Sequence, residues 1–250
     1  MVWQQRLLEG PGADAARPVR SHAGRPAGRM SGDVNNAPAV APVWWLITHL
    51  GSSSLLLPAF GLLVWGLWRS GAQTAARHYV LAMAGAVLVT VVSKCLFYGW
   101  GIGIAALDFT GVSGHGLLAS AILPLLLRGL PGGSAHRWGP ALGAGLALLV
   151  GVSRVMVGAH SVSEVLAAWL LGLAVSWPVV QRLRTATVVH WSTRWAPLLL
   201  VLALNTSTAT YLPTHALEVR IALWLSGQVQ PFTRHQLHQP PAAPPTPTRP

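Results

Sequence analysis

The sequence predicts an all-α fold, a polytopic membrane helical bundle of about five to six transmembrane helices. Three observations predict it: 52% of the 250 residues are hydrophobic, only 9% are charged, and the apolar residues fall in long runs. A soluble domain usually carries about 25% charged residues. Because lipid offers no partner for free backbone N–H and C=O groups, segments that span the lipid bilayer are expected to be helical.

Six apolar runs define the expected helices: 46–68, 79–93, 116–130, 138–153, 162–180 and 195–212. The first and fifth have the roughly 17–25 residues that a spanning helix needs. The second can continue past Lys94, the third and fourth are short, and the sixth fades into polar residues. The segment that follows, HALEVRIALWLSG, is predicted either to continue the sixth span or to form an amphipathic helix at the membrane surface.

The two ends of the chain differ in composition from the apolar middle. Residues 1–42 are rich in Pro, Gly, Ala and Arg without periodicity, and we expect a flexible N-terminal segment. Residues 230–250 are expected to be a disordered Pro-rich tail. The membrane domain is therefore predicted to occupy 43–229. Nothing in the sequence indicates an oligomeric state.

The charged residues predict how the helices are oriented. The net charge of +11 arises mainly because the chain has only six acidic residues. Its arginines are scattered between apolar runs, and this distribution argues against a nucleic-acid partner. Alternate loops carry the arginines, and such loops face the cytoplasm; the residues are Arg69, Arg77, Arg128, Arg137, Arg182, Arg184 and Arg194. We therefore expect a multi-pass protein of the cell membrane, such as a bacterial inner membrane, with loops 94–115 and 153–161 facing the periplasm or cell exterior.

The N-terminus does not fit this orientation. It would lie outside, yet five arginines precede Met30. A native start at Met30 would remove them. A re-entrant segment near 41–53 is the other explanation, and the sequence does not choose between the two.

The two outer loops hold the remaining charges of the membrane body, residues 43–212. Ionisable groups at the membrane edge are costly and mark functional sites. Here they are Lys94, Asp108, Arg154 and Glu164, accompanied by His115 and His160. Arginine suits phosphate contact, and the helix expected to begin near His115 offers free N–H groups to an anion. The pattern predicts a phosphate site in which two histidines attack phosphorus and transfer protons. Two carboxylates in separate loops are too few for a two-metal site, so we expect no metal and no other cofactor.

Two short motifs carry a family resemblance. Ser113-Gly114-His115 resembles the PSGH motif of the type 2 phosphatidic acid phosphatase superfamily. Ser153-Arg154, five residues, His160, three residues and Glu164 resemble that family's SRxxxxxHxxxD motif, and Lys94 resembles the lysine that opens its KxxxxxxRP motif. The match runs from about 94 to 164.

The resemblance implies a membrane phosphatase that hydrolyses a lipid phosphate or a polyprenyl diphosphate through a phosphohistidine. His160 would be the nucleophile, His115 the acid for the leaving group, and Glu164 the residue that holds His160. The phosphoryl oxygens would be bound by Lys94, Ser113, Gly114 and Arg154.

Three positions depart from the family pattern. Val112 stands in place of proline, and Glu164 stands in place of aspartate. Gly101 falls where the family has the arginine of KxxxxxxRP. Possible substitutes for this arginine are Lys94 oriented by Asp108, backbone N–H groups, or Arg220.

Several other interpretations remain open. Ser161-Val162-Ser163-Glu164 is also typical of a capping box, in which Glu164 would satisfy the start of a helix. Both roles can coexist because a carboxylate has two oxygens. For the whole protein, the alternatives are a catalytically weak or inactive homologue, a transporter, and the related vanadate-dependent haloperoxidase chemistry. No residue identifies the lipid headgroup.

Overall fold

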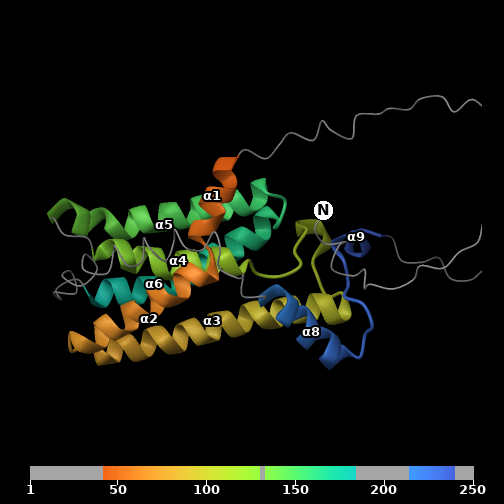
Figure 1. The fold of residues 1–250 in the computed structure, drawn as a ribbon, viewed down its shortest axis with the longest axis horizontal. Coiled ribbons are helices and arrows are strands. Elements are labelled where there is room, and N and C mark those ends of the chain that lie inside the picture. The colour runs from red at the N-terminus through yellow and green to blue at the C-terminus, as the bar shows by residue number, and fades with distance from the viewer. Residues whose placement is uncertain (1–41, 130–132, 184–213, 240–250) are drawn as a thin grey trace, which may run out of the picture. The chain divides into compact units, whose positions relative to one another are not determined.

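The computed structural model describes residues 42–129, 133–183 and 214–239, and there the chain is helical with a single isolated β-bridge (Figure 1). The predicted all-α bundle is confirmed. The helices are α1 (Pro42–Leu50), α2 (Ser53–Arg69), α3 (Gln73–Trp100), α4 (Gly114–Arg128), α5 (Gly133–Met156), α6 (Val162–Arg182), α8 (Thr214–Ser226) and α9 (Arg234–Leu237), with a 3-10 turn at Ala105–Leu107.

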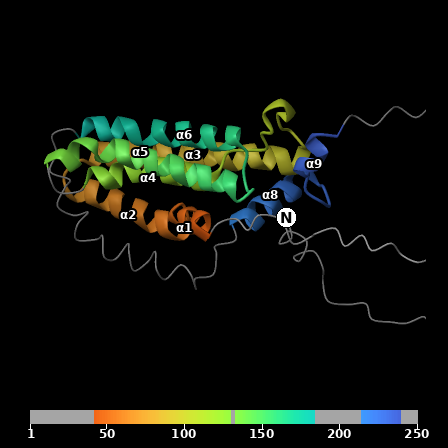
Figure 2. The same ribbon diagram turned by 90° about the horizontal axis from the view of Figure 1, so that it is seen from above.

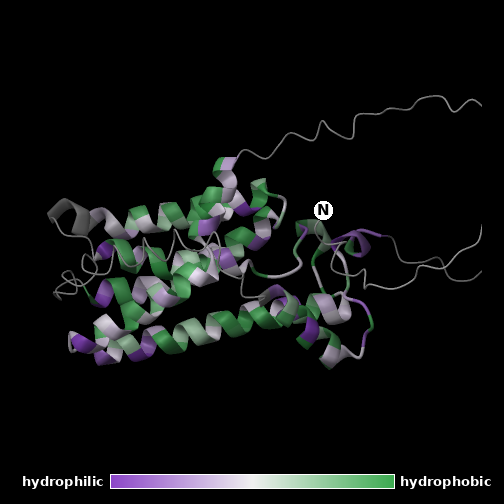
Figure 3. Ribbon diagram, in the orientation of Figure 1, coloured by the Kyte–Doolittle hydropathy of each residue, from purple (hydrophilic) through white to green (hydrophobic). Residues whose placement is uncertain are grey.

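Within the described residues, four stretches are long and apolar enough to cross a membrane: Pro42–Arg69, Gln73–Trp100, Trp138–Met156 and Val162–Arg182. Helix α4 is apolar but shorter, with 15 residues. Hydrophobic residues follow the helices, and hydrophilic ones gather toward their ends (Figure 3). The predicted run 195–212 lies outside the described residues.

The first apolar run is broken rather than continuous. Helix α1 ends at Leu50 and α2 begins at Ser53, with Gly51 and Ser52 between them. Gly51 has no room for a side chain, because an added Cβ would come within 2.5 Å of the Val150 side chain and 3.3 Å of the His115 Cβ. The break thus lets the backbone approach α5 and the start of α4 closely.

Helix α4 lies among its neighbours and contacts α2, α3, α5 and α6 (Figure 2). Small residues make this close packing possible. An added Cβ on Gly143 would meet the backbone of Leu123, and one on Gly172 would meet Ser120 and the backbone of Leu117. Ser120 also donates to Ala168 O across the α4–α6 contact, at 3.2 Å. The start of α4, which carries His115, is therefore held between firmly packed helices.

Helices α3 to α6 bring their site-bearing ends together. The last residues of α3 and α5 and the first residues of α4 and α6 flank the two loops that hold the motifs. The opposite helix ends carry arginines: Arg128 donates to Leu183 O at 3.1 Å, and Arg182 contacts His78 at 2.8 Å. This separation matches the alternation of charged loops in the sequence.

The C-terminal part of the chain packs on α3. Helix α8 lies beside the second half of α3 (Figures 1 and 2), and Phe232 N donates to Tyr98 O at 3.0 Å. Residues 231–239 include α9 and reach the loop that follows α3. The structure differs here from the expectation of a tail beginning at residue 230, because these residues contact the bundle.

Candidate active site

The first turn of α6 carries both proposed roles of Glu164. Ser161 is the N-cap, and its hydroxyl accepts from Glu164 N while the Glu164 carboxylate accepts from Ser161 N, which completes a capping box. The same carboxylate contacts His160 Nδ1 at 2.7 Å. Helix capping and imidazole orientation therefore coexist in one side chain.

The Glu164 carboxylate is fully buried, and both of its oxygens are occupied. Oε2 accepts from His160 and Ser161 N. Oε1 accepts from Thr110 N at 2.8 Å, from the Thr110 hydroxyl, and from Arg234 Nη2 at 2.8 Å. A buried carboxylate with this many donors remains ionised and fixed in position.

The contact with Glu164 defines the chemistry available to His160. An ionised carboxylate can only accept, so Nδ1 carries the hydrogen and the Nε2 lone pair is free in the neutral ring. Burial is the largest influence and lowers the pKa of His160, the hydrogen bond and charge of Glu164 oppose it, and the net pKa lies below the ordinary value. The neutral ring, which can act as a nucleophile, is thereby favoured near pH 7.

The second histidine lies at the start of α4. Ser113 is fully buried and is the N-cap, with its hydroxyl accepting from Gly116 N at 3.5 Å. His115 is close enough to Arg154, His160 and Lys94 for their charges to act on it. An added Cβ on Gly114 would meet no atom within 4 Å, so the backbone there faces open space.

Arg154 comes from the last turn of α5. Its Nε is buried and has no hydrogen-bond partner among the described residues. Its carbonyl accepts from His160 N at 3.2 Å, which ties the two residues of the second motif together. The neighbouring Ser153 is fully buried and contacts Thr48 at 2.8 Å, so it joins α5 to α1. Arg154 thus has donors left for an anion.

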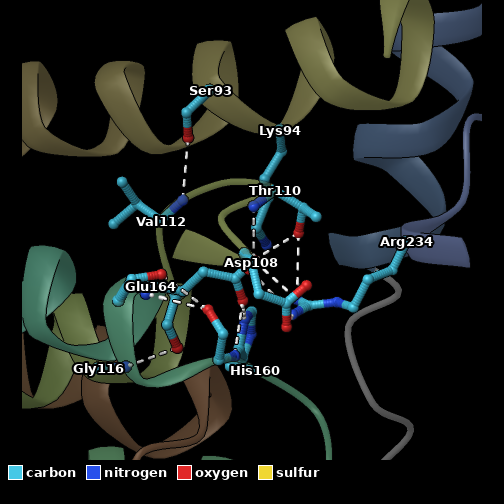
Figure 4. A network of polar contacts seen from close by, with 12 residues as sticks. Ser93, Lys94, Asp108, Thr110, Val112, Gly116, His160, Glu164 and Arg234 are labelled. Atoms are coloured by element: carbon cyan, nitrogen blue, oxygen red, sulfur yellow. Dashed lines mark hydrogen bonds and ion pairs between the residues drawn. The ribbon is translucent and has the colours of Figure 1, made fainter. Parts of the chain in front are cut away.

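Lys94 has a partner that the sequence did not suggest. Its ammonium contacts Glu218 of α8 at 2.8 Å, leaving donor capacity on a group with three N–H bonds. Gly111 lies against it, since an added Cβ there would come within 2.8 Å of Lys94 Cγ. Lys94 oriented by Asp108, one of the three possible substitutes for the missing arginine, is not what the structure shows. Asp108 contacts Arg234 (Figure 4) and His238 instead.

Arg234 of α9 is a site residue that sequence reasoning missed. It contacts Asp108, Thr110 and Glu164 (Figure 4). Burial alone would raise the pKa of Asp108, but hydrogen bonds from His238 and Arg234 and their charges hold it below its usual range. Arg234 lies 70 residues from Glu164 in the chain, within the expected tail, so no local motif could predict that the two residues are in contact. Arg220 is exposed and forms no such contact with the described residues.

Two departures from the family pattern have a structural reason. Val112 N donates to Ser93 Oγ at 3.1 Å, a bond that proline could not make because it has no N–H. Gly101 ends α3 with a φ of +68°, and an added Cβ there would lie 2.9 Å from the Phe232 ring. Position 101 therefore has no room for an arginine while Phe232 covers it.

Comparison with known proteins agrees with the helical fold and the motifs. A family model described as the PAP2 superfamily matches residues 75–188. The chain is 35% identical over 205 residues to an uncharacterized 22.5 kDa protein in the cps region of Klebsiella pneumoniae, covering 78% of this chain and 98% of that relative. It is 33% identical over 136 residues to phosphatidylglycerophosphatase B of Bacillus subtilis, covering 51% and 67%. No solved structure matches the chain.

Proposed function

The chain belongs to the PAP2 superfamily. We propose that it is an integral membrane phosphatase that releases phosphate from a lipid phosphate or diphosphate, with its active site on the outer face of the cell membrane. The family and the relative named phosphatidylglycerophosphatase B support a lipid phosphatase. The apolar helices support a multi-pass membrane protein. Phosphatidylglycerophosphate is accordingly the first substrate to test.

The observation that carries the proposal is the pair formed by His160 and Glu164. Glu164 is fully buried and holds Nδ1 of His160, so Nε2 is left as the reactive nitrogen. The buried Nε of Arg154, which lacks a partner, belongs to the residue whose carbonyl accepts from His160 N. A nucleophile next to an unsatisfied cation suits attack on an anionic phosphorus centre.

In the first step, Nε2 of His160 forms a bond to phosphorus while the bond to the lipid oxygen breaks. His115 donates a proton to the departing oxygen. In the second step, a water oxygen attacks the phosphohistidine and His115 takes its proton. The N–P bond then breaks, inorganic phosphate leaves, and both histidines return to their starting protonation. Glu164 stays ionised and stabilises the positive charge that His160 acquires.

The phosphoryl oxygens would be held by four groups. Lys94 and Arg154 supply charge, with Lys94 sharing its ammonium between the substrate and Glu218. Ser113 and the backbone N–H of Gly114 lie at the start of α4, where the helix dipole favours an anion. A phosphate dianion bound here also favours the imidazolium form of His115, which is the form that a proton donor needs.

The proposal is tested by phosphate release from the purified full chain. The substrates are phosphatidylglycerophosphate, phosphatidate and a polyprenyl diphosphate, each with and without EDTA. We expect release from at least one substrate, no loss with EDTA, and a fall of at least about 1000-fold in His160→Ala. The matched control His78→Ala removes a histidine at the opposite helix ends and should stay within about threefold of wild type.

A catalytically inactive homologue is the second candidate, favoured by Gly101 at the position of the family's arginine. A folded wild-type protein that releases no phosphate from any of the three lipids would support it. Release that persists in His160→Ala would instead exclude the assigned nucleophile.

A further inference from the structure

We propose that Arg234, in the segment of residues 231–239 here called the strap, is a positioning residue for the Glu164–His160 pair. This inference rests on the proposed function. Arg234 acts through Glu164 and does not contact the reacting atoms.

Arg234 joins three parts of the site. Its Nη2 donates to Glu164 Oε1 at 2.8 Å and to Thr110 Oγ1 at 3.2 Å. Its Nη1 donates to the backbone carbonyl of Asp108 at 3.1 Å and to the Asp108 carboxylate. His238, one turn further along the strap, contacts the same carboxylate at 2.8 Å. The strap is thus fastened to the loop after α3 and to the start of α6 (Figure 4).

The charges explain why such a cation is needed. Glu164 has no exposed side-chain surface, and an ionised carboxylate in that position requires a cationic partner. If His160 supplied the positive charge, it would be protonated and unable to attack phosphorus. Arg234 supplies a permanent charge, so Glu164 can remain ionised while His160 stays neutral.

The strap also accounts for the missing arginine at position 101. Phe232 packs over Gly101, and its backbone N–H is bonded to Tyr98 O at the end of α3. The strap therefore covers the point from which an arginine side chain at position 101 would extend. Gly101 leaves room for Phe232 of the strap, and the strap brings a different arginine, Arg234, to the site, where it contacts Glu164.

The test compares Arg234→Ala and Arg234→Lys with His235→Ala in the purified full chain. His235 is exposed in the same short helix and contacts Gln239, so it is the matched control. We expect kcat to fall about 10- to 100-fold in Arg234→Ala, with KM within about threefold, because partners of reactive groups have effects of this size. Arg234→Lys should recover part of kcat, since a lysine keeps the charge but lacks the planar guanidinium that donates to several acceptors at once.

The pH profile separates positioning from a general loss of structure. The charged and titratable groups that act on His160 are Lys94 of α3, His115 of α4, Arg154 of α5 and Glu164 of α6, and Arg234 of the strap faces His160 through its contact with Glu164. Removing Arg234 leaves Glu164 more available to the imidazolium, so the pKa of His160 rises. We expect the acid limb of kcat/KM to move up by roughly one pH unit in Arg234→Ala and to stay in place in His235→Ala.

Histidine-selective NMR titration gives a readout that does not depend on activity. With the His160 signal identified by His160→Gln, its midpoint should move up in Arg234→Ala. An unchanged midpoint and acid limb, or a loss confined to KM, would overturn the inference even if wild type is active. If wild type releases no phosphate, the proposed function fails, while the NMR midpoint still decides whether Arg234 controls the protonation of His160.

Discussion

Glu164 shows how one side chain can serve both folding and chemistry. As a helix residue three positions after Ser161, it satisfies the N-cap N–H, and as the partner of His160 it fixes the tautomer. Glutamate has one methylene more than the aspartate of the family motif. On a helix, residues i and i+4 lie about 5–6 Å apart between Cβ atoms, and the structure shows that the longer side chain spans this separation.

We expect Glu164→Gln to lower kcat by at least about 100-fold, because the amide cannot accept at both ends of the network and does not stabilise the imidazolium. The measurement is steady-state phosphate release at saturating substrate. Ser163→Ala is the matched control, because it removes a hydroxyl of the same turn that contacts the Ser161 hydroxyl and Leu107 O and makes no hydrogen bond to the Glu164 carboxylate. The assigned role would be contradicted if Glu164→Gln kept more than about a tenth of wild-type kcat while Ser163→Ala behaved normally.

At the scale of elements, the position of His115 depends on how closely α4 approaches its neighbours. Helix α4 is too short to anchor itself by length, so the contact of α6 with α4 through Gly172 fixes its depth in the bundle. An added Cβ at Gly172 would come within 2.0 Å of Ser120 Oγ and 2.6 Å of Leu117 O. Backbone atoms cannot move aside as a flexible side chain can, so the two helices would have to separate.

Gly172→Ala should therefore destabilise the folded bundle by about 1–3 kcal/mol. Gly145→Ala, in α5, is the control, because an added Cβ there meets no atom within 4 Å. Alanine favours a helix over glycine by about 1 kcal/mol, so the control should be neutral or slightly more stable. Thermal unfolding in detergent micelles measures both variants. Equal Tm values for the two would show that the α4–α6 contact tolerates a methyl group.

At the scale of the whole molecule, the sequence predicted what depends on local patterns. Hydropathy located α3 to α6, and the spacing of His160 and Glu164 within one motif indicated their contact. The sequence could not predict contacts between segments that are far apart in the chain and carry no motif. Glu218 lies 124 residues from Lys94, and Arg234 lies in a stretch whose proline content suggested a tail. The helix break at Gly51 lies close against Val150 and His115, and a hydropathy pattern cannot predict which residues pack against a given position.

The orientation of the whole molecule can be tested through its only cysteine. Cys95 is buried, so a Cys95→Ser background removes the native thiol. Ala159 is exposed in the loop that precedes His160, and Gln73 is exposed at the first residue of α3, at the other helix ends. Because the arginine-rich loops are expected in the cytoplasm, a membrane-impermeant maleimide should label Ala159→Cys in intact spheroplasts and Gln73→Cys only after lysis. Labelling in the reverse order would place the histidines on the cytoplasmic side, and their substrate would then have to come from the inner leaflet.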